Sequence, residues 1–76
     1  MESFSGRLRE ARRRKVWRQE DLAAASGVAV VTISRLESGH GEAPRQSTVR
    51  KLADALDVDA TWLVFGEVEW QGKDAA

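Results

Sequence analysis

Apolar side chains recur at helical spacing along most of this 76-residue chain. The clearest stripe is formed by Val49, Leu52, Ala53 and Leu56, which lie at positions i, i+3, i+4 and i+7 and so face one side of an α-helix. No pair of segments shows the strict alternation that is typical of paired β-strands. The pattern predicts five helices. The first three cover about residues 3–15, 19–26 and 29–38, the fourth starts after Ser47 and carries this stripe, and the fifth covers about residues 60–65.

Capping and turn-forming residues mark the ends of these helices. Ser3 or Ser5 suits the N-cap of the first helix and Ser47 that of the fourth, because a serine hydroxyl accepts a hydrogen bond from a free backbone N–H group. The segment 39–44 holds two glycines and the only proline, which predicts a loop. Gly66 ends the fifth helix. We therefore expect one domain over residues 1–66 and a C-terminal tail over residues 67–76.

The segment 19–37 is the most informative part of the chain. Gly27 separates two short helical patterns, and a sharp turn between helices favours glycine because glycine adopts a left-handed conformation without steric cost. Ala23 is small enough to let the two helices cross closely. The apolar contacts that would fix the angle between the two helices are Leu22, Val28, Ile33 and Leu36. This geometry would place the helix after Gly27 in a DNA major groove, while the helix before Gly27 supports it.

Length and composition narrow the possible classes of protein. A chain of 76 residues forms one small domain, and with no cysteine it has neither a disulfide scaffold nor a thiolate metal site. No apolar run approaches the roughly 20 residues of a membrane-spanning helix. The N-terminus has charges but no apolar segment behind them, which argues against a secretory signal. The absence of cysteine suits a cytoplasmic protein.

The charges are distributed unevenly, although 12 basic and 12 acidic side chains balance. Residues 1–38 hold eight basic and five acidic side chains, whereas residues 39–76 hold four basic and seven acidic ones. Such asymmetry can give one face a positive field, and a solvated charged surface explains it equally well. Most arginines of the first helix are expected outside the apolar stripe of Phe4, Leu8 and Ala11, namely Arg7, Arg9, Arg13 and Arg14.

Three strings of the chain resemble the Cro and phage-repressor (XRE-type) helix-turn-helix family over about residues 4–66. They are WRQEDLAAASGVAVVTISRLESG, STVRKLADALDV and ATWLVFG, in the order and spacing of that family. The resemblance implies an all-α, compact five-helix bundle of the lambda-repressor-like type. It also implies that the third helix enters the major groove of double-stranded DNA, with two copies of the chain on a two-fold symmetric operator.

The resemblance also implies which residues contact DNA. Gln19 matches a glutamine that opens the second helix and contacts a phosphate, and Arg18 lies beside it. On the third helix, Arg35 is the side chain able to pair with guanine, although contact with a phosphate is the equal alternative. The full expected set of DNA-binding residues is Arg18, Gln19, Val30, Val31, Thr32, Ser34, Arg35, Arg45 and Thr48.

The resemblance assigns one arginine of the basic run to the structure itself. Arg12 and Glu37 match a salt bridge between the first and third helices of the family. The chain departs from the family where polar residues are usual at Val30 and Val31, because valine can contact only a thymine methyl group or a sugar. Arg18 stands where a Ser or Thr cap is preferred, and losing that cap costs about 1 kcal/mol.

Other chemistry finds little support in the sequence. Glu20 and Asp21 are adjacent in the first turn of a helix, where acidic side chains favour the helix dipole. His40, the only histidine, lies between two glycines without partners at metal-ligand spacing. No nucleophile, base and orienting group come together, so we expect no enzymatic activity, no metal, no cofactor and no small-molecule ligand.

The aromatic residues near the C-terminus suggest both core and contact roles. Trp62, Leu63 and Phe65 are expected in the core, with part of their surface available to a dimer partner, and Val16 and Trp17 are expected to fold back onto the core. For Trp70, packing on its own domain, packing across a dimer and disorder all remain open.

Together these features predict a sequence-specific DNA-binding transcriptional regulator of repressor, antitoxin or controller type. The alternative is a protein-interaction module on the same fold that has lost DNA binding, which the neutral net charge and the two valines favour.

Overall fold

Five α-helices account for all regular structure in a computed structural model of the protein, which describes residues 3–39 and 43–66. The all-α prediction is therefore confirmed for this part of the chain. The predicted helices agree with the observed ones to within a residue or two. The helices are α1 (Phe4–Arg14), α2 (Gln19–Ser26), α3 (Val30–Ser38), α4 (Gln46–Leu56) and α5 (Ala60–Phe65).

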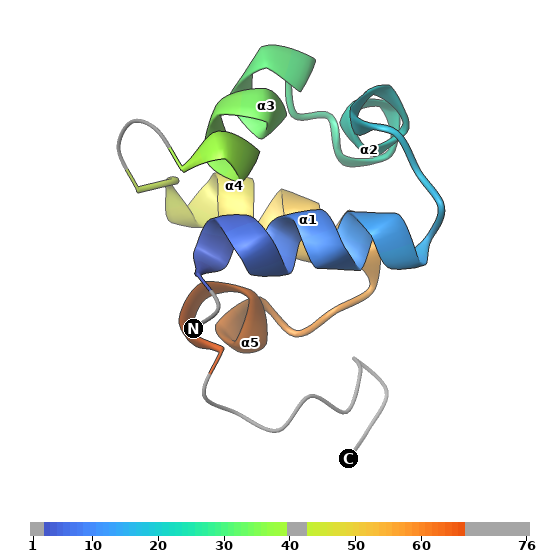
Figure 1. The fold of residues 1–76 in the computed structure, drawn as a ribbon. Helices are drawn as coiled ribbons and strands as arrows, with labels where there is room; N and C mark the ends of the chain where they lie inside the picture. Colours follow the sequence, from blue (N-terminus) through green and yellow to red (C-terminus); the bar gives the residue numbers. More distant parts are fainter. Residues whose placement is uncertain (1–2, 40–42, 67–76) are drawn as a thin grey trace.

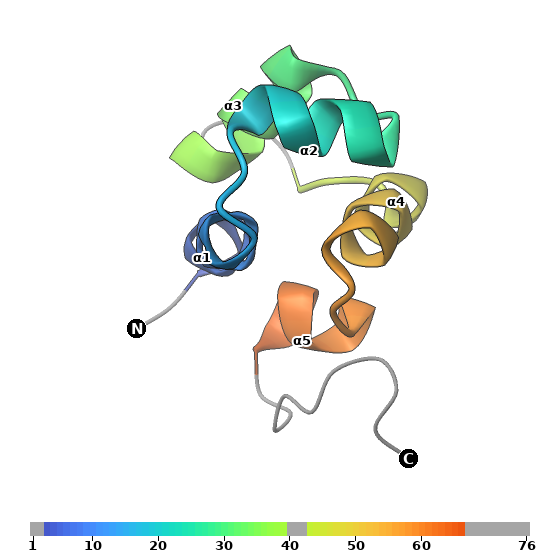
Figure 2. The ribbon, with the colours of Figure 1, turned by 90° about the vertical axis from the view of Figure 1, so that its right-hand side faces the viewer.

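The helices form a bundle with α2 and α3 at one end and α5 at the other (Figure 1). The view turned by 90° shows the same order, with α1 and α4 between the two ends (Figure 2). α1 packs against α3 and α5, α4 packs against α2 and α5, and α2 packs against α3. Each helix of the described chain therefore touches at least two others. None of the described helices combines the length and the apolar character that crossing a membrane requires.

Each helix contributes one large aliphatic side chain that is completely buried. These side chains are Leu8, Leu22, Ile33, Leu52 and Leu63, in the order α1 to α5. Full burial of such a side chain stabilises a fold by about 1.5–3 kcal/mol relative to leaving it exposed. The helices consequently share a single core, and the predicted stripe from Val49 to Leu56 on α4 is wholly buried within it.

The helix ends match the sequence in most but not all places. The Ser3 hydroxyl caps α1 by accepting a hydrogen bond of 3.1 Å from the Gly6 N–H group. Gly66 adopts a left-handed φ of 69° immediately after α5, as predicted. Ser47 is not an N-cap, because α4 already starts at Gln46 and places Ser47 within its first turn. The predictions for His40, Trp70 and the C-terminal tail over residues 67–76 lie outside the described residues.

Arg7 is buried rather than placed outside the apolar stripe, which corrects the prediction made from periodicity. It is only 5% exposed. Its Nε donates a hydrogen bond of 3.0 Å to the Leu63 carbonyl, and its Nη2 donates one of 2.6 Å to the Val64 carbonyl. A side chain at Gly66 would collide with this guanidinium group. Arg7 thus connects α1 to the free carbonyl groups at the end of the short helix α5.

Two apolar residues were wrongly expected to be buried. Phe65 is 65% exposed, whereas Trp62 and Leu63 are in the core as predicted. Val16 is 90% exposed, although Trp17 beside it does pack against the core. Val16 also has a left-handed φ of 57°, because it occupies the turn that ends α1. A β-branched residue is strained in that conformation.

Replacing Val16 with glycine is expected to stabilise the protein by about 1 kcal/mol, because the left-handed strain is removed and little packing is lost. Urea unfolding followed by far-UV circular dichroism would measure the change. Lys15→Gly is the matched control, since Lys15 has an ordinary right-handed conformation and should lose stability on the same substitution. A loss of stability in Val16→Gly would contradict the prediction.

Candidate nucleic-acid interface

The turn between α2 and α3 is built as the sequence predicted. Gly27 has a left-handed φ of 77°, and its N–H group donates to the Ala23 carbonyl over 2.9 Å. A Cβ atom at Gly27 would meet no neighbour within 4 Å, so the backbone conformation alone favours glycine here. The Val28 side chain is buried, and its N–H group donates to the Ser26 hydroxyl over 3.1 Å. These contacts fix how α3 leaves α2.

Helix α3 has a buried side and an outward side. Ile33, Leu36 and Glu37 are buried against the other helices. Val30 is 42% exposed and Val31 57% exposed. The predicted reading residues Ser34 and Arg35 are also exposed, and Thr32 is half-buried. The outward side therefore offers two apolar side chains, two hydroxyl groups and one guanidinium group to a ligand.

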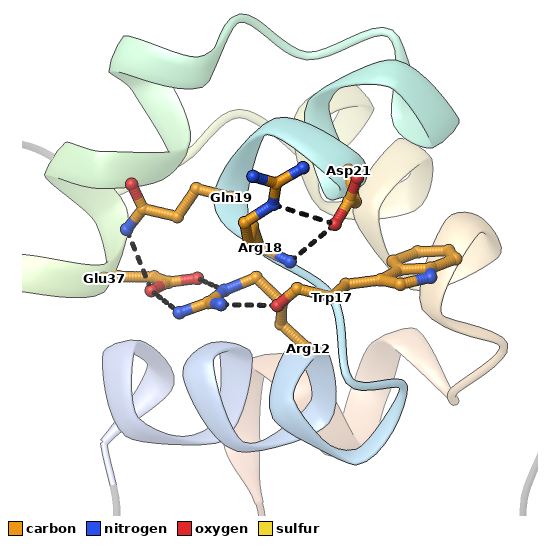
Figure 3. Close-up of polar contacts among 6 residues, drawn as sticks. All are labelled: Arg12, Trp17, Arg18, Gln19, Asp21 and Glu37. Carbon is orange, nitrogen blue, oxygen red and sulfur yellow. Dashed lines mark hydrogen bonds and ion pairs between the residues drawn. The ribbon is translucent and has the colours of Figure 1, made fainter.

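Arg18 precedes α2 and lies beside the carboxylate of Asp21 (Figure 3) and that of Glu20. Its backbone N–H group donates to the Asp21 carboxylate over 2.8 Å, which supplies half of a capping box. Its guanidinium Nε lies 3.7 Å from Asp21 and 3.8 Å from Glu20. Arg18 therefore supplies no side-chain cap, but these acidic side chains reduce the unfavourable effect of its charge at the helix N-terminus. The Arg18 side chain is 80% exposed and remains accessible.

A buried polar network joins three helices beneath this surface (Figure 3). Arg12 on α1 donates to both oxygens of Glu37 on α3, over 2.6 Å from Nε and 2.8 Å from Nη2. Its Nη1 donates to the Trp17 carbonyl over 2.7 Å. The structure thus contains the salt bridge implied by the family resemblance. Gln19 joins the same network by donating from Nε2 to Glu37 over 3.1 Å, a contact that the sequence did not suggest.

The network keeps Glu37 ionised. Burial acts to raise the pKa of the Glu37 carboxyl group, but hydrogen bonds from Arg12 and Gln19 and the charges of Arg12 and Arg9 outweigh it. The net effect is a lowered pKa for Glu37. The pKa of Arg12 is raised by its hydrogen bond to Glu37, partly offset by burial, so Arg12 stays charged at any ordinary pH.

Stability is expected to fall in acid as Glu37 takes up a proton. A carboxyl group with a lowered folded-state pKa contributes stability above its unfolded pKa of about 4.3, and this contribution is lost as the pH falls through the folded value. Urea unfolding between neutral pH and about pH 3 would show the decline. A Glu37→Gln variant should show a shallower decline, while the control Glu20→Gln, at a side chain that is 71% exposed, should follow the wild type. Equal slopes for wild type and Glu37→Gln would contradict the assignment.

The remaining predicted site residues lie at the starts of α4 and α2. Arg45 is the residue before the helix and is exposed, and Thr48 is half-buried in the first turn. The half-buried Gln19 begins α2. The predicted residues therefore come from the starts of α2 and α4 and from the outward side of α3.

The family model of the helix-turn-helix proteins matches residues 8–63, which include all of α2, α3 and α4. The chain belongs to the helix-turn-helix family. Among helix-turn-helix proteins, it is 38% identical over 65 residues to the transcriptional repressor RghR of Bacillus subtilis and 39% identical over 66 residues to the transcriptional regulator PrtR of Pseudomonas aeruginosa. These matches cover 86% and 87% of the chain but only 48% and 25% of the relatives. The chain thus spans about half of the first relative's length and a quarter of the second's.

A solved helix-turn-helix structure supports the same assignment. The P22 c2 repressor protein, in complex with a synthetic operator, superimposes with a TM-score of 0.80 at 28% sequence identity. The match covers 88% of this chain and 100% of the repressor chain. Both the predicted family and the predicted phage-repressor fold are therefore confirmed.

Proposed function

We propose that the protein is a DNA-binding transcriptional regulator that places α3 in the major groove of double-stranded DNA. The observation that carries the proposal is the outward side of α3, which is exposed on a helix positioned by the Gly27 turn and the polar network at Glu37. The similarity to a repressor in complex with operator DNA supports it. Because such a regulator works where the DNA is, we expect it to act in the cytoplasm.

The exposed residues divide into two proposed roles. Arg35 would read a base, since a guanidinium group can donate two hydrogen bonds to guanine, and Thr32 and Ser34 would assist it. Val30 and Val31 would contact thymine methyl groups or sugars. Contacts with the DNA phosphate backbone would come from the starts of α2 and α4, where free N–H groups and the helix dipole favour phosphate. The residues there are Arg18, Gln19, Arg45 and Thr48.

We further infer that the regulator acts as a homodimer. An apolar groove is lined by Phe4, Pro44, Val49, Val64 and the exposed Phe65. A two-fold dimer needs a patch that fits its own copy, and this groove carries both an apolar floor and a protruding aromatic ring. No part of α2 or α3 lines it, so pairing here would leave the reading surface free. The centres of the two half-sites should then lie roughly 34 Å apart.

An Arg35→Ala variant tests the reading role. DNA fragments selected by the protein from genomic DNA of its source would provide the duplex, and titration at two salt concentrations would give affinities. Loss of a base contact should weaken binding by about 1–3 kcal/mol and relax specificity at one base pair. Arg13→Ala, an equal change of charge at an exposed site on α1, is the matched control. A uniform loss across all sequences would assign Arg35 to a phosphate instead.

Two further results would overturn parts of the proposal. No binding to any duplex at low salt would exclude the regulator and favour a protein-interaction module. Sedimentation of Phe65→Glu beside the wild type tests the dimer, because a buried unpaired charge should disrupt a pairing through this groove. Identical sedimentation of the two proteins would exclude this groove as the dimer contact.

A further inference from the structure

The Gln19 side chain, which the family resemblance assigns to DNA, is hydrogen-bonded to the buried Glu37 of its own chain. Glu37 accepts a hydrogen bond of 3.1 Å from Gln19 Nε2 while both of its oxygens also bind Arg12. The Glu37 side chain is only 4% exposed. The guanidinium group of Arg12 balances the negative charge of Glu37. The Glu37 carboxylate therefore repels a nearby phosphate only weakly while it binds Gln19.

The chemistry of Glu37 fixes which way the Gln19 amide points. An ionised carboxylate only accepts hydrogen bonds, so the amide must turn its nitrogen toward Glu37 and its oxygen away. Figure 3 shows this orientation, with the amide nitrogen of Gln19 directed at Glu37 and the oxygen on the far side. An amide nitrogen carries two N–H groups, and the contact with Glu37 uses one of them. The second N–H group remains available to an acceptor.

We propose that Glu37 is a positioning residue for DNA binding, because it holds the half-buried Gln19 so that the second N–H group of the amide meets a backbone phosphate. The inference rests on the proposed DNA-binding function. A glutamine already held in one rotamer loses less freedom on binding than a free one, so the hold should strengthen the contact. Glu37 itself is buried and does not reach the DNA, so its effect on the phosphate contact passes through Gln19.

The same network links the phosphate contact to the reading helix. Arg12 belongs to α1, Gln19 is the first residue of α2, and Glu37 lies in the last turn of α3. Arg12 also binds the Trp17 carbonyl in the segment that leads into α2. A phosphate bound at Gln19 is therefore tied through a single carboxylate to α3. This coupling sets the depth and register at which the outward side of α3 meets the bases.

Nuclear magnetic resonance of the whole wild-type chain tests the proposal without a substitution. In the free protein, one side-chain amide proton of Gln19 should be shifted and protected by Glu37. When mixed-sequence duplex DNA is added at low salt, the second amide proton should shift while the first stays protected. If the second proton does not respond, Gln19 makes no phosphate contact. If the first proton loses its protection, Gln19 leaves Glu37 on binding. Either result would overturn the proposal.

A double-mutant cycle provides the second test. Gln19→Ala should weaken DNA binding by about tenfold or more, the effect of one hydrogen bond to a charged phosphate. Glu37→Gln should weaken it by a smaller factor, because a Gln19 that is no longer held can still reach the phosphate. The double variant should bind about as well as Gln19→Ala alone, because the effect of Glu37 on the phosphate contact passes through Gln19. Independent losses that multiply would indicate a purely structural role for Glu37 and overturn the proposal. If Glu37→Gln does not fold, the resonance experiment decides.

Failure of this inference can be distinguished from failure of the proposed function. The backbone amide resonances of α3 report DNA binding independently of Gln19. If they do not respond to the duplex, the protein does not bind DNA through this surface and both ideas fail. If they respond while the second Gln19 amide proton does not, only the role of Glu37 and Gln19 is wrong.

Discussion

A Glu37→Ala variant is expected to lose about 3–5 kcal/mol of unfolding free energy, because it leaves the guanidinium group of Arg12 buried without its carboxylate partner. Arg12 and Glu37 are 12% and 4% exposed in their side chains, so water has little access to the groups that lose their partners. Gln19 loses its acceptor at the same time. For a domain of this size, a loss of that magnitude is a large fraction of total stability.

Urea unfolding followed by far-UV circular dichroism would measure the loss. The double variant Arg12→Met/Glu37→Leu should recover much of it, because an apolar pair avoids burying an unpaired charge. Glu20→Ala removes an exposed carboxylate at an ion pair of 3.8 Å and should change stability by less than about 1 kcal/mol. A Glu37→Ala variant as stable as Glu20→Ala would show that the buried pair does not stabilise the fold.

An Arg7→Met variant is expected to lose about 2–3 kcal/mol, because the carbonyl groups of Leu63 and Val64 lose the charged donor that binds them. Arg7→Lys should recover less than half of the loss, since a single ammonium group cannot reproduce the fork of a guanidinium group at two acceptors. Urea unfolding followed by circular dichroism gives the size of the loss. In a background with Trp17 and Trp70 replaced by Phe, fluorescence of the remaining Trp62, which is buried on α5, should report loosening of that helix.

The matched control for Arg7 is Arg9→Met. Arg9 lies on the same helix, but its side chain is exposed, so the same substitution should change stability by less than about 0.5 kcal/mol. Equal effects at the two positions would mean that the link between α1 and α5 contributes nothing beyond an ordinary surface arginine.

The sequence predicted those features that depend on neighbours along the chain. The stripe from Val49 to Leu56 identified α4 because its four apolar residues follow the helical period without interruption. Gly27 identified the turn because a left-handed backbone favours glycine whatever packs around it. The bounds of α5 were also predicted, since Gly66 ends a short apolar run.

Features that depend on distant parts of the chain were predicted less well. Arg7 looked like one more arginine of a basic run, and its partners are 56 and 57 residues away. Phe65 belongs to an apolar triplet, yet a six-residue helix buries only one side, and that side carries Trp62 and Leu63. Val16 is exposed because the turn after α1 directs it outward. Periodicity within one helix carries no information about these contacts.

The candidate site shows the same division. The resemblance supplied the pair of Arg12 and Glu37, since both positions match the family. The contact from Gln19 to Glu37 was not suggested, because Gln19 had already been assigned to a phosphate and a glutamine can serve two partners at once. The DNA contacts of the exposed residues remain predictions.

The two sides of α3 have a consequence for how such a protein can diversify. Ile33, Leu36 and Glu37 hold the helix in place, while Val31, Ser34 and Arg35 take no part in the core. Substituting the exposed residues leaves the buried ones unchanged, and surface substitutions of this kind usually alter the free energy of unfolding by less than about 0.5 kcal/mol. Under the proposed function, target preference and folding would then be separate traits, and one scaffold could supply regulators with different operators.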